Sequence, residues 1–99
     1  MTVDALKMAI ENHVRVAFEY AGHHRVVVPM ALGRDGSGDW QLRGLQVAGG
    51  SSSGSLGANV PKLWKLAGMS NVVPLGERFE IPQQYRRGDV SMSYIEAQL

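Results

Sequence analysis

The sequence predicts a mainly β domain of the α+β kind, a small five-stranded β-barrel with an N-terminal helix and a short C-terminal helix. Three observations predict it. Five short apolar or alternating stretches follow one another between turn-forming segments. The stretches at the two ends of the chain repeat at helical spacing instead. The 99 residues, 44% hydrophobic and 19% charged, suffice for a single domain, 1–99, with one core.

The leading helix is predicted within residues 1–13. Val3, Leu6 and Ile10 recur at intervals of three and four, with charged residues on the opposite side. From Val14 onward the apolar residues alternate with polar ones, which is the pattern of a strand with one solvated face. We therefore expect a strand over residues 14–20, with its even-numbered residues in the core.

A hairpin and a third strand follow. Residues 21–24 are expected to form the turn, and residues 25–28 the return strand, closed by Pro29 because proline cannot donate to the next rung. Residues 40–47 predict the third strand. Gly44 interrupts its alternation and favours a bulge or a sharp bend.

Two further strands complete the predicted barrel of residues 14–79, at 63–66 and 72–75, with a turn at 68–71. The Gly/Ser-rich stretch from Gly49 to Gly57 is expected to be a mobile loop, one that either connects strands or orders over a ligand. Curling the sheet hides its edges. The expected core residues are Phe18, Val26, Trp40, Leu42, Trp64 and Leu66.

Residues 80–99 read as a basic extension followed by a helix. Asp89 is placed to cap that helix, and Met92, Ile95 and Leu99 share one helical stripe. A helix of this length does not hold its form alone in water, so it must dock on the barrel or on a second copy of the chain.

Composition excludes several function classes. Without cysteine there is no thiol nucleophile, zinc knuckle or iron-sulfur cluster. Ten basic against nine acidic residues give a net charge of +1, so anion binding requires a local cluster. No apolar run is long enough to span a membrane, and residues 1–10 are too polar for a signal peptide. We expect a soluble, cytoplasmic protein that contacts no membrane.

Catalytic and metal motifs are weak in this sequence. His23 and His24 stand in an expected turn with no chelating partner at a suitable interval. Residues 51–53 are serines without a nucleophile elbow, and the triplet 87–89 spells a cell-adhesion motif that chance accounts for. We expect no catalytic residue, no metal site and no cofactor.

Strand parity points to a basic outer face. Arg43 and Lys65 are out of phase with the core residues beside them, and Arg25 and Gln41 are expected to join them. This face is either an anion site or a solvated surface whose charges pair with Glu19 and Asp39. If the bound anion is a nucleotide, Tyr20 or Tyr85 would stack against its base.

Five short motifs follow one another along the chain: Phe18-x-Tyr20, Arg25-x-x-x-Pro29, Trp40-Gln41-Leu42, Leu63-Trp64-Lys65-Leu66 and Glu77-Arg78-Phe79. Their order resembles the WYL domain family, and in particular its small standalone bacterial members. The Trp-Tyr-Leu triplet that gives the family its name has glutamine, Gln41, in its middle position here.

The resemblance implies an Sm-like or SH3-like barrel and a non-catalytic sensing module of transcription regulation or phage defence. Such modules bind nucleic acid or nucleotides and often dimerise. It places Tyr20, Arg25, Arg43 and Lys65 on the ligand face. We expect binding of single-stranded nucleic acid or a nucleotide by a homodimer. The alternative is a homo-oligomeric scaffold without a small ligand, in which Tyr85, Met92 and Tyr94 form an exposed apolar patch.

Overall fold

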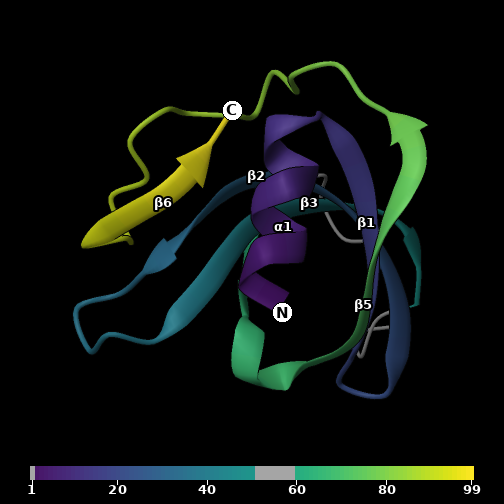
Figure 1. Ribbon diagram of the computed structural model, residues 1–99, viewed down its shortest axis with the longest axis horizontal. Helices are drawn as coiled ribbons and strands as arrows, with labels where there is room; N and C mark the ends of the chain where they lie inside the picture. Colours follow the sequence, from purple (N-terminus) through teal and green to yellow (C-terminus); the bar gives the residue numbers. More distant parts are fainter. Residues whose placement is uncertain (1, 51–59) are drawn as a thin grey trace.

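The computed structural model describes residues 2–50 and 60–99 and has one helix at the start of a mainly β chain (Figure 1). The predicted Gly49–Gly57 loop, beyond Gly50, and the serines at 51–53 lie outside the described residues. The leading helix is confirmed. The elements are α1 (Thr2–Glu11), β1 (Val14–Tyr20), β2 (His23–Arg34), β3 (Trp40–Gly49), β4 (Lys62–Lys65), a 3₁₀ turn (Leu66–Gly68), β5 (Met69–Arg78) and β6 (Tyr94–Gln98).

The strands form one antiparallel sheet that is not closed. Its order is β4-β3-β2-β1-β5, and β6 pairs with β2. Within residues 2–50 and 60–99, β4 and β5 stand at the two ends of this order without pairing to each other. The mainly β fold is therefore confirmed, whereas the closed barrel is replaced by an open sheet that bends around α1 (Figure 1).

Strand β2 runs through Pro29 instead of ending there, which corrects the predicted strand 25–28. On one edge, β2 pairs with β1 as far as Val27 and with β6 from Ala31 onward. On the other edge it pairs with β3, with a register shift between Pro29 and Ala31. Pro29 thus lies where the first edge changes partner, the place in a central strand where a missing N–H does least harm.

The first hairpin turn is shorter than predicted. Tyr20 pairs with His23, so the turn consists of Ala21 and Gly22, both with positive φ, and both histidines belong to β2. Positive φ at both central positions is the geometry of a two-residue hairpin turn. The turn expected at 68–71 is also wrong, because the 3₁₀ turn makes the connection and β5 begins at Met69.

The predicted C-terminal helix is wrong, because residues 94–98 form strand β6. Tyr94 pairs with Arg34 and Gln98 with Ala31, so the tail adds a strand to the otherwise open edge of β2. Pairing with that edge satisfies the tail's backbone groups, which a short unsupported helix could not do as well. Asp89 consequently caps no helix.

The main hydrophobic core lies between α1 and the concave face of the sheet. It includes the predicted core residues Phe18, Leu42 and Trp64. The other predicted members, Trp40 and Leu66, are only partly buried against it. Val26 is a wrong assignment, because Val27 takes the inward position of β2. The remaining buried members are Leu6, Ala9, Ile10, Val16 and Leu32.

A second, smaller cluster lies on the outer face of the same sheet. Val28, Met30 and Leu45 are buried there beneath partly buried residues of the C-terminal segment, among them Phe79 and Tyr85. The segment after β5 therefore acts as a cover for the outer face. This cover is what positions the candidate site.

The apolar patch predicted for the scaffold alternative is not formed. Met92 is only 8% exposed, and the Tyr85 hydroxyl donates to the main-chain oxygen of Leu99 at 2.7 Å. Tyr94 remains exposed, with the Arg34 guanidinium 4.7 Å from its ring centre. In the described part of the chain, no helix is long and apolar enough to cross a membrane.

Candidate anion-binding pocket

Three of the predicted site residues share the outer face of the sheet, as strand parity predicted. In the β3–β4 pair, Gln41 lies opposite Lys65 and Arg43 lies opposite Leu63. Residues two apart in a strand, and their direct cross-strand partners, point to the same side. Gln41, Arg43 and Lys65 therefore project from one face.

Arg25 is not on that face, which corrects the prediction. It pairs with Phe18 and its side chain is buried, at 4% exposure, on the concave side. Its Nε and Nη2 donate to the Tyr20 carbonyl at 3.2 and 2.9 Å, and its Nη1 donates to Gln46 Oε1 at 3.2 Å. The guanidinium also lies 5.4 Å from the Trp64 ring centre. Arg25 is thus a buried structural cation.

Tyr20 belongs to the same inner cluster, so its predicted role as an outer-face base stacker is also wrong. Its ring meets Trp64 edge to face at 5.2 Å between centroids. Its hydroxyl accepts a hydrogen bond from the Lys65 main-chain N–H at 3.3 Å. The Arg25 guanidinium covers its ring at 5.8 Å.

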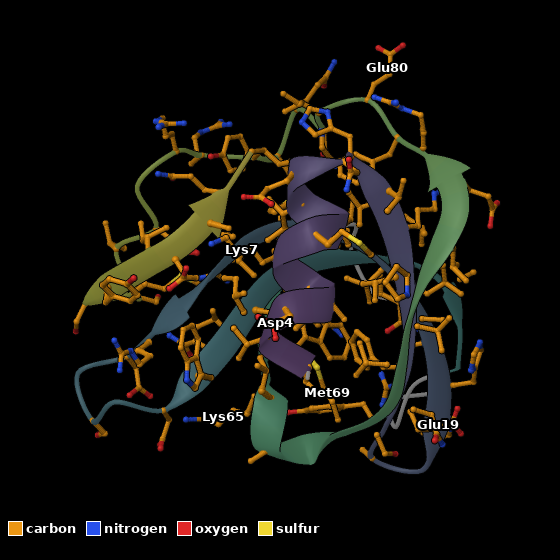
Figure 2. All side chains as sticks on the ribbon, in the orientation of Figure 1. Asp4, Lys7, Glu19, Lys65, Met69 and Glu80 are labelled. Atoms are coloured by element: carbon orange, nitrogen blue, oxygen red, sulfur yellow. The ribbon has the colours of Figure 1, made fainter. Side chains whose placement is uncertain are left out.

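Gln41 and Lys65 are engaged elsewhere on the outer face. Gln41 is 3% exposed and its Nε2 donates to the Ser91 carbonyl at 2.9 Å. The exposed ammonium of Lys65 contacts Asp35 at 3.4 Å, whereas Glu19, an expected partner for this face, pairs with His24. In Figure 2 Lys65 lies near the lower edge of the molecule, at the opposite end from Glu80.

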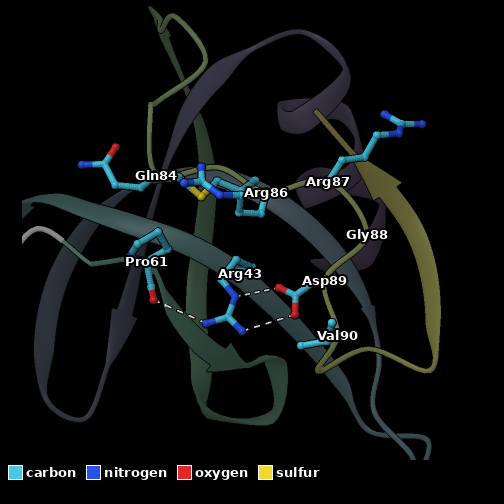
Figure 3. Close-up of a pocket in the computed structure, with 9 residues that line it drawn as sticks. Arg43, Pro61, Gln84, Arg86, Arg87, Gly88, Asp89 and Val90 are labelled. Carbon is cyan, nitrogen blue, oxygen red and sulfur yellow. Dashed lines mark hydrogen bonds and ion pairs between the residues drawn. The ribbon is translucent and has the colours of Figure 1, made fainter.

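A pocket of about 450 Å³ opens on the outer face, where the C-terminal segment crosses the sheet (Figure 3). Its size is in the range of small-ligand sites. Met30 of β2 and Arg43 of β3 line it from the sheet, and the segment lines it from above. The other lining residues are Pro61, Gln84, Arg86, Arg87, Gly88, Asp89 and Val90.

Arg43 is held by Asp89 on one wall of the pocket. Its Nε lies 2.6 Å from Asp89 Oδ2 and its Nη2 lies 3.3 Å from Oδ1 (Figure 3). Nη1 donates to the Pro61 carbonyl at 3.4 Å, and Nη2 also reaches the Ser91 hydroxyl at 3.3 Å. The hydrogen bond from Arg43 is the main reason that the pKa of Asp89 is lowered.

Arg86 supplies a second guanidinium to the pocket. It lies above Arg43 in Figure 3, and its Nη1 donates to the main-chain oxygens of Gln83 and Tyr85 at 2.8 and 2.9 Å. Within residues 2–50 and 60–99, no Asp or Glu side chain pairs with it. Arg87 points away from the pocket and donates to the Leu99 main-chain oxygen at 3.2 Å.

The pocket therefore combines two inward guanidiniums, one carboxylate and an apolar floor. Met30, which is fully buried, forms part of that floor, and Val90 is 99% exposed at the rim. Asp89 stays ionised near neutral pH because its pKa is lowered, so it does not serve as a proton donor there. In the described ranges no three His, Asp or Glu side chains are grouped as metal ligands. This arrangement is suited to holding an organic anion.

Sequence reasoning placed Arg43 correctly but missed Arg86, Asp89 and Met30 as its neighbours. A signal for Arg86 was present, because residues 85–88 read as a basic stretch in an extended segment. Nothing local indicated that this segment folds back over β3.

No family model, no curated protein and no solved structure matches the chain.

Proposed function

We propose that this protein is a non-catalytic binding module for a nucleotide-sized anion, of the sensing kind that the WYL-like motifs imply. The ligand sits in the outer-face pocket, with its acidic group at Arg86 and its apolar part against Pro61 and Val90. The strand order supports the proposal, since β1 to β4 form a meander and β5 returns beside β1, as in an SH3-like barrel opened between its end strands.

One observation carries the proposal: Arg86, which has no carboxylate partner within residues 2–50 and 60–99, brings a guanidinium to a pocket of about 450 Å³. Among the described side chains that line the pocket, Asp89 is the single carboxylate, and it is paired with Arg43. Arginine forks bind phosphate and carboxylate through paired N–H groups. Because the chain's net charge is only +1, this local cation, more than any global field, supplies the attraction.

Isothermal titration with a panel of nucleotides and a short single-stranded DNA tests the proposal. We expect Arg86→Ala to weaken binding about tenfold or more, because a charge-assisted hydrogen bond is lost. Arg78→Ala is the matched control, since Arg78 is an exposed arginine of β5 outside the pocket lining. We expect it to change affinity less than about twofold.

Two results would overturn the proposal. One is equal loss of affinity in both variants, which would mean binding by general charge. The other is no binding to any member of the panel. In the latter case, concentration-dependent dimerisation in sedimentation velocity would favour the scaffold alternative.

A further inference from the structure

We propose that the pocket selects a singly charged phosphodiester group over a doubly charged phosphate monoester. This inference rests on the proposed function and adds the ligand's charge state to it. Asp89 is the residue that determines the selection. Its carboxylate lines the pocket wall and neutralises Arg43, one of the two inward guanidiniums.

The Arg43–Asp89 pair is built to stay together when a ligand enters. The Asp89 side chain is only 7% exposed, and its Oδ1 also accepts a hydrogen bond from the Ser91 N–H at 2.9 Å. Arg43 also donates from Nη1 to the Pro61 carbonyl and from Nη2 to the Ser91 hydroxyl. A ligand that displaced Asp89 would leave a carboxylate buried without its partner, which is strongly unfavourable.

Arg86 is therefore the cation that meets the ligand. Two main-chain carbonyls hold its Nη1, which orients the guanidinium beside the pocket. Arg87 is left out of the charge count because its guanidinium points away from the pocket, toward Leu99. Arg43, Arg86 and Asp89 then give the inward side chains a net charge of +1.

One positive charge is matched by one negative charge on the ligand. Attraction to a fixed cation grows in proportion to the ligand's charge, whereas the cost of removing an anion from water grows with the square of that charge. A dianion therefore loses more hydration than a single guanidinium returns. Its second charge would also share the pocket with the Asp89 carboxylate, which lines the wall beside Arg43 (Figure 3).

The shared chemistry of the preferred ligand is a phosphodiester monoanion beside a nucleoside. It has two sources, a cyclic nucleotide or an internal phosphate of a single strand. A terminal phosphate monoester carries a charge of about −1.5 to −2 at pH 7, with a second pKa of about 6. The two ligand types thus differ mainly in charge when base and sugar are the same.

Cyclic 3′,5′-AMP and 5′-AMP form the matched probe pair, measured by titration at pH 7.5. We expect the wild-type protein to bind cyclic AMP about three- to tenfold more tightly than AMP. Asp89→Asn raises the pocket's charge to +2 and should reverse that order. Asp39→Asn, an exposed carboxylate outside the pocket lining, is the control and should leave the order unchanged.

A second measurement uses the wild-type protein alone, in case Asp89→Asn does not fold. Lowering the pH from 7.5 to 5.5 converts AMP toward the monoanion. The difference in affinity between cyclic AMP and AMP should therefore become smaller. The charged groups of the pocket lining are Arg43, Arg86, Arg87 and Asp89. Arginine stays protonated over this range and the pKa of Asp89 is lowered, so the charge of the lining does not change between pH 7.5 and 5.5. Tyr85, which packs beside Met30, has a raised pKa owing to burial and stays neutral.

An oligothymidylate without terminal phosphate distinguishes the two sources. Tighter binding of the oligonucleotide than of cyclic AMP would identify the ligand as an internal phosphate of a single strand. Tighter binding of cyclic AMP would identify it as a cyclic nucleotide. AMP binding as tightly as cyclic AMP at pH 7.5 would overturn the charge selection and leave the proposed function standing. Failure of all three probes to bind would overturn the proposed function itself.

Discussion

Arg43 of β3 donates both Nε and Nη2 to the carboxylate of Asp89, which lies 46 residues further along the chain. This pair ties the C-terminal segment to the outer face of the sheet. It also forms one wall of the pocket, so the same contact serves the fold and the proposed site.

Asp89→Asn should lower the free energy of unfolding by about 1.5–3 kcal/mol at pH 7, because a charged hydrogen-bond acceptor is lost. The hydrogen bond from Arg43 lowers the pKa of Asp89 in the folded protein. The pair therefore stabilises the fold fully above the unfolded-state pKa of about 3.9, and that stabilisation is lost as the pH falls through the lower folded-state value. Thermal denaturation of both proteins between pH 2 and 7 checks this. A difference in Tm that persists unchanged at pH 2 would contradict it.

Gly33→Ala should disrupt the contact between β2 and β6. A Cβ at Gly33 would stand 2.1 Å from the Tyr94 carbonyl oxygen and 2.9 Å from Met92 Sδ, so the backbone of the tail must move. We expect a loss of about 1–3 kcal/mol, measured by urea denaturation. Gly76→Ala is the matched control in β5, because its Cβ meets nothing within 4 Å. If both variants lose equal stability, the tail does not pack on β2 as described.

Arg25→Met should destabilise the protein while leaving anion binding unchanged. The substitution keeps an apolar stem but leaves the Tyr20 carbonyl and Gln46 Oε1 without their donor. A loss of about 2–4 kcal/mol in the free energy of unfolding is expected from two unsatisfied acceptors. Denaturation and nucleotide titration on the same sample check both parts. Weaker nucleotide binding by folded Arg25→Met would restore Arg25 to the ligand site.

Trp64→Phe should cost much more stability than Trp40→Phe. Trp64 is 3% exposed and its Nε1 donates to the Gly44 carbonyl at 3.1 Å, so the change leaves both a cavity and an unpaired oxygen. We expect a loss of about 2–4 kcal/mol. Trp40 is only partly buried, and about 1 kcal/mol is expected there. Denaturation followed by circular dichroism compares the two without relying on tryptophan emission.

The first half of the fold could be predicted from the sequence because its signals are local. The change from helical to alternating spacing at Val14 marks where β1 begins, and α1 precedes it as expected. The tail could not be predicted in this way. Its apolar residues fit a helix as well as a strand, and the open edge of β2, which decides between them, is visible only in three dimensions.

Only the part of the candidate site that depends on local sequence patterns could be predicted. Parity within β3 placed Arg43 on the outer face correctly. The expected outer-face position of Arg25 was wrong, because the hairpin pairs it with Phe18, an inward residue of β1. The approach of Arg86 to Arg43 depends on a long-range crossing that no local pattern encodes.

The shared edge of β2 gives the two halves of that strand different folding histories. Its first half meets β1 across a two-residue turn, so closing that loop costs little entropy. Its second half meets β6, which is brought back only after β3, β4 and β5 have intervened. We expect amides around Ala31 and Leu32 to gain protection from hydrogen exchange later in refolding than those around Val26 and Val27.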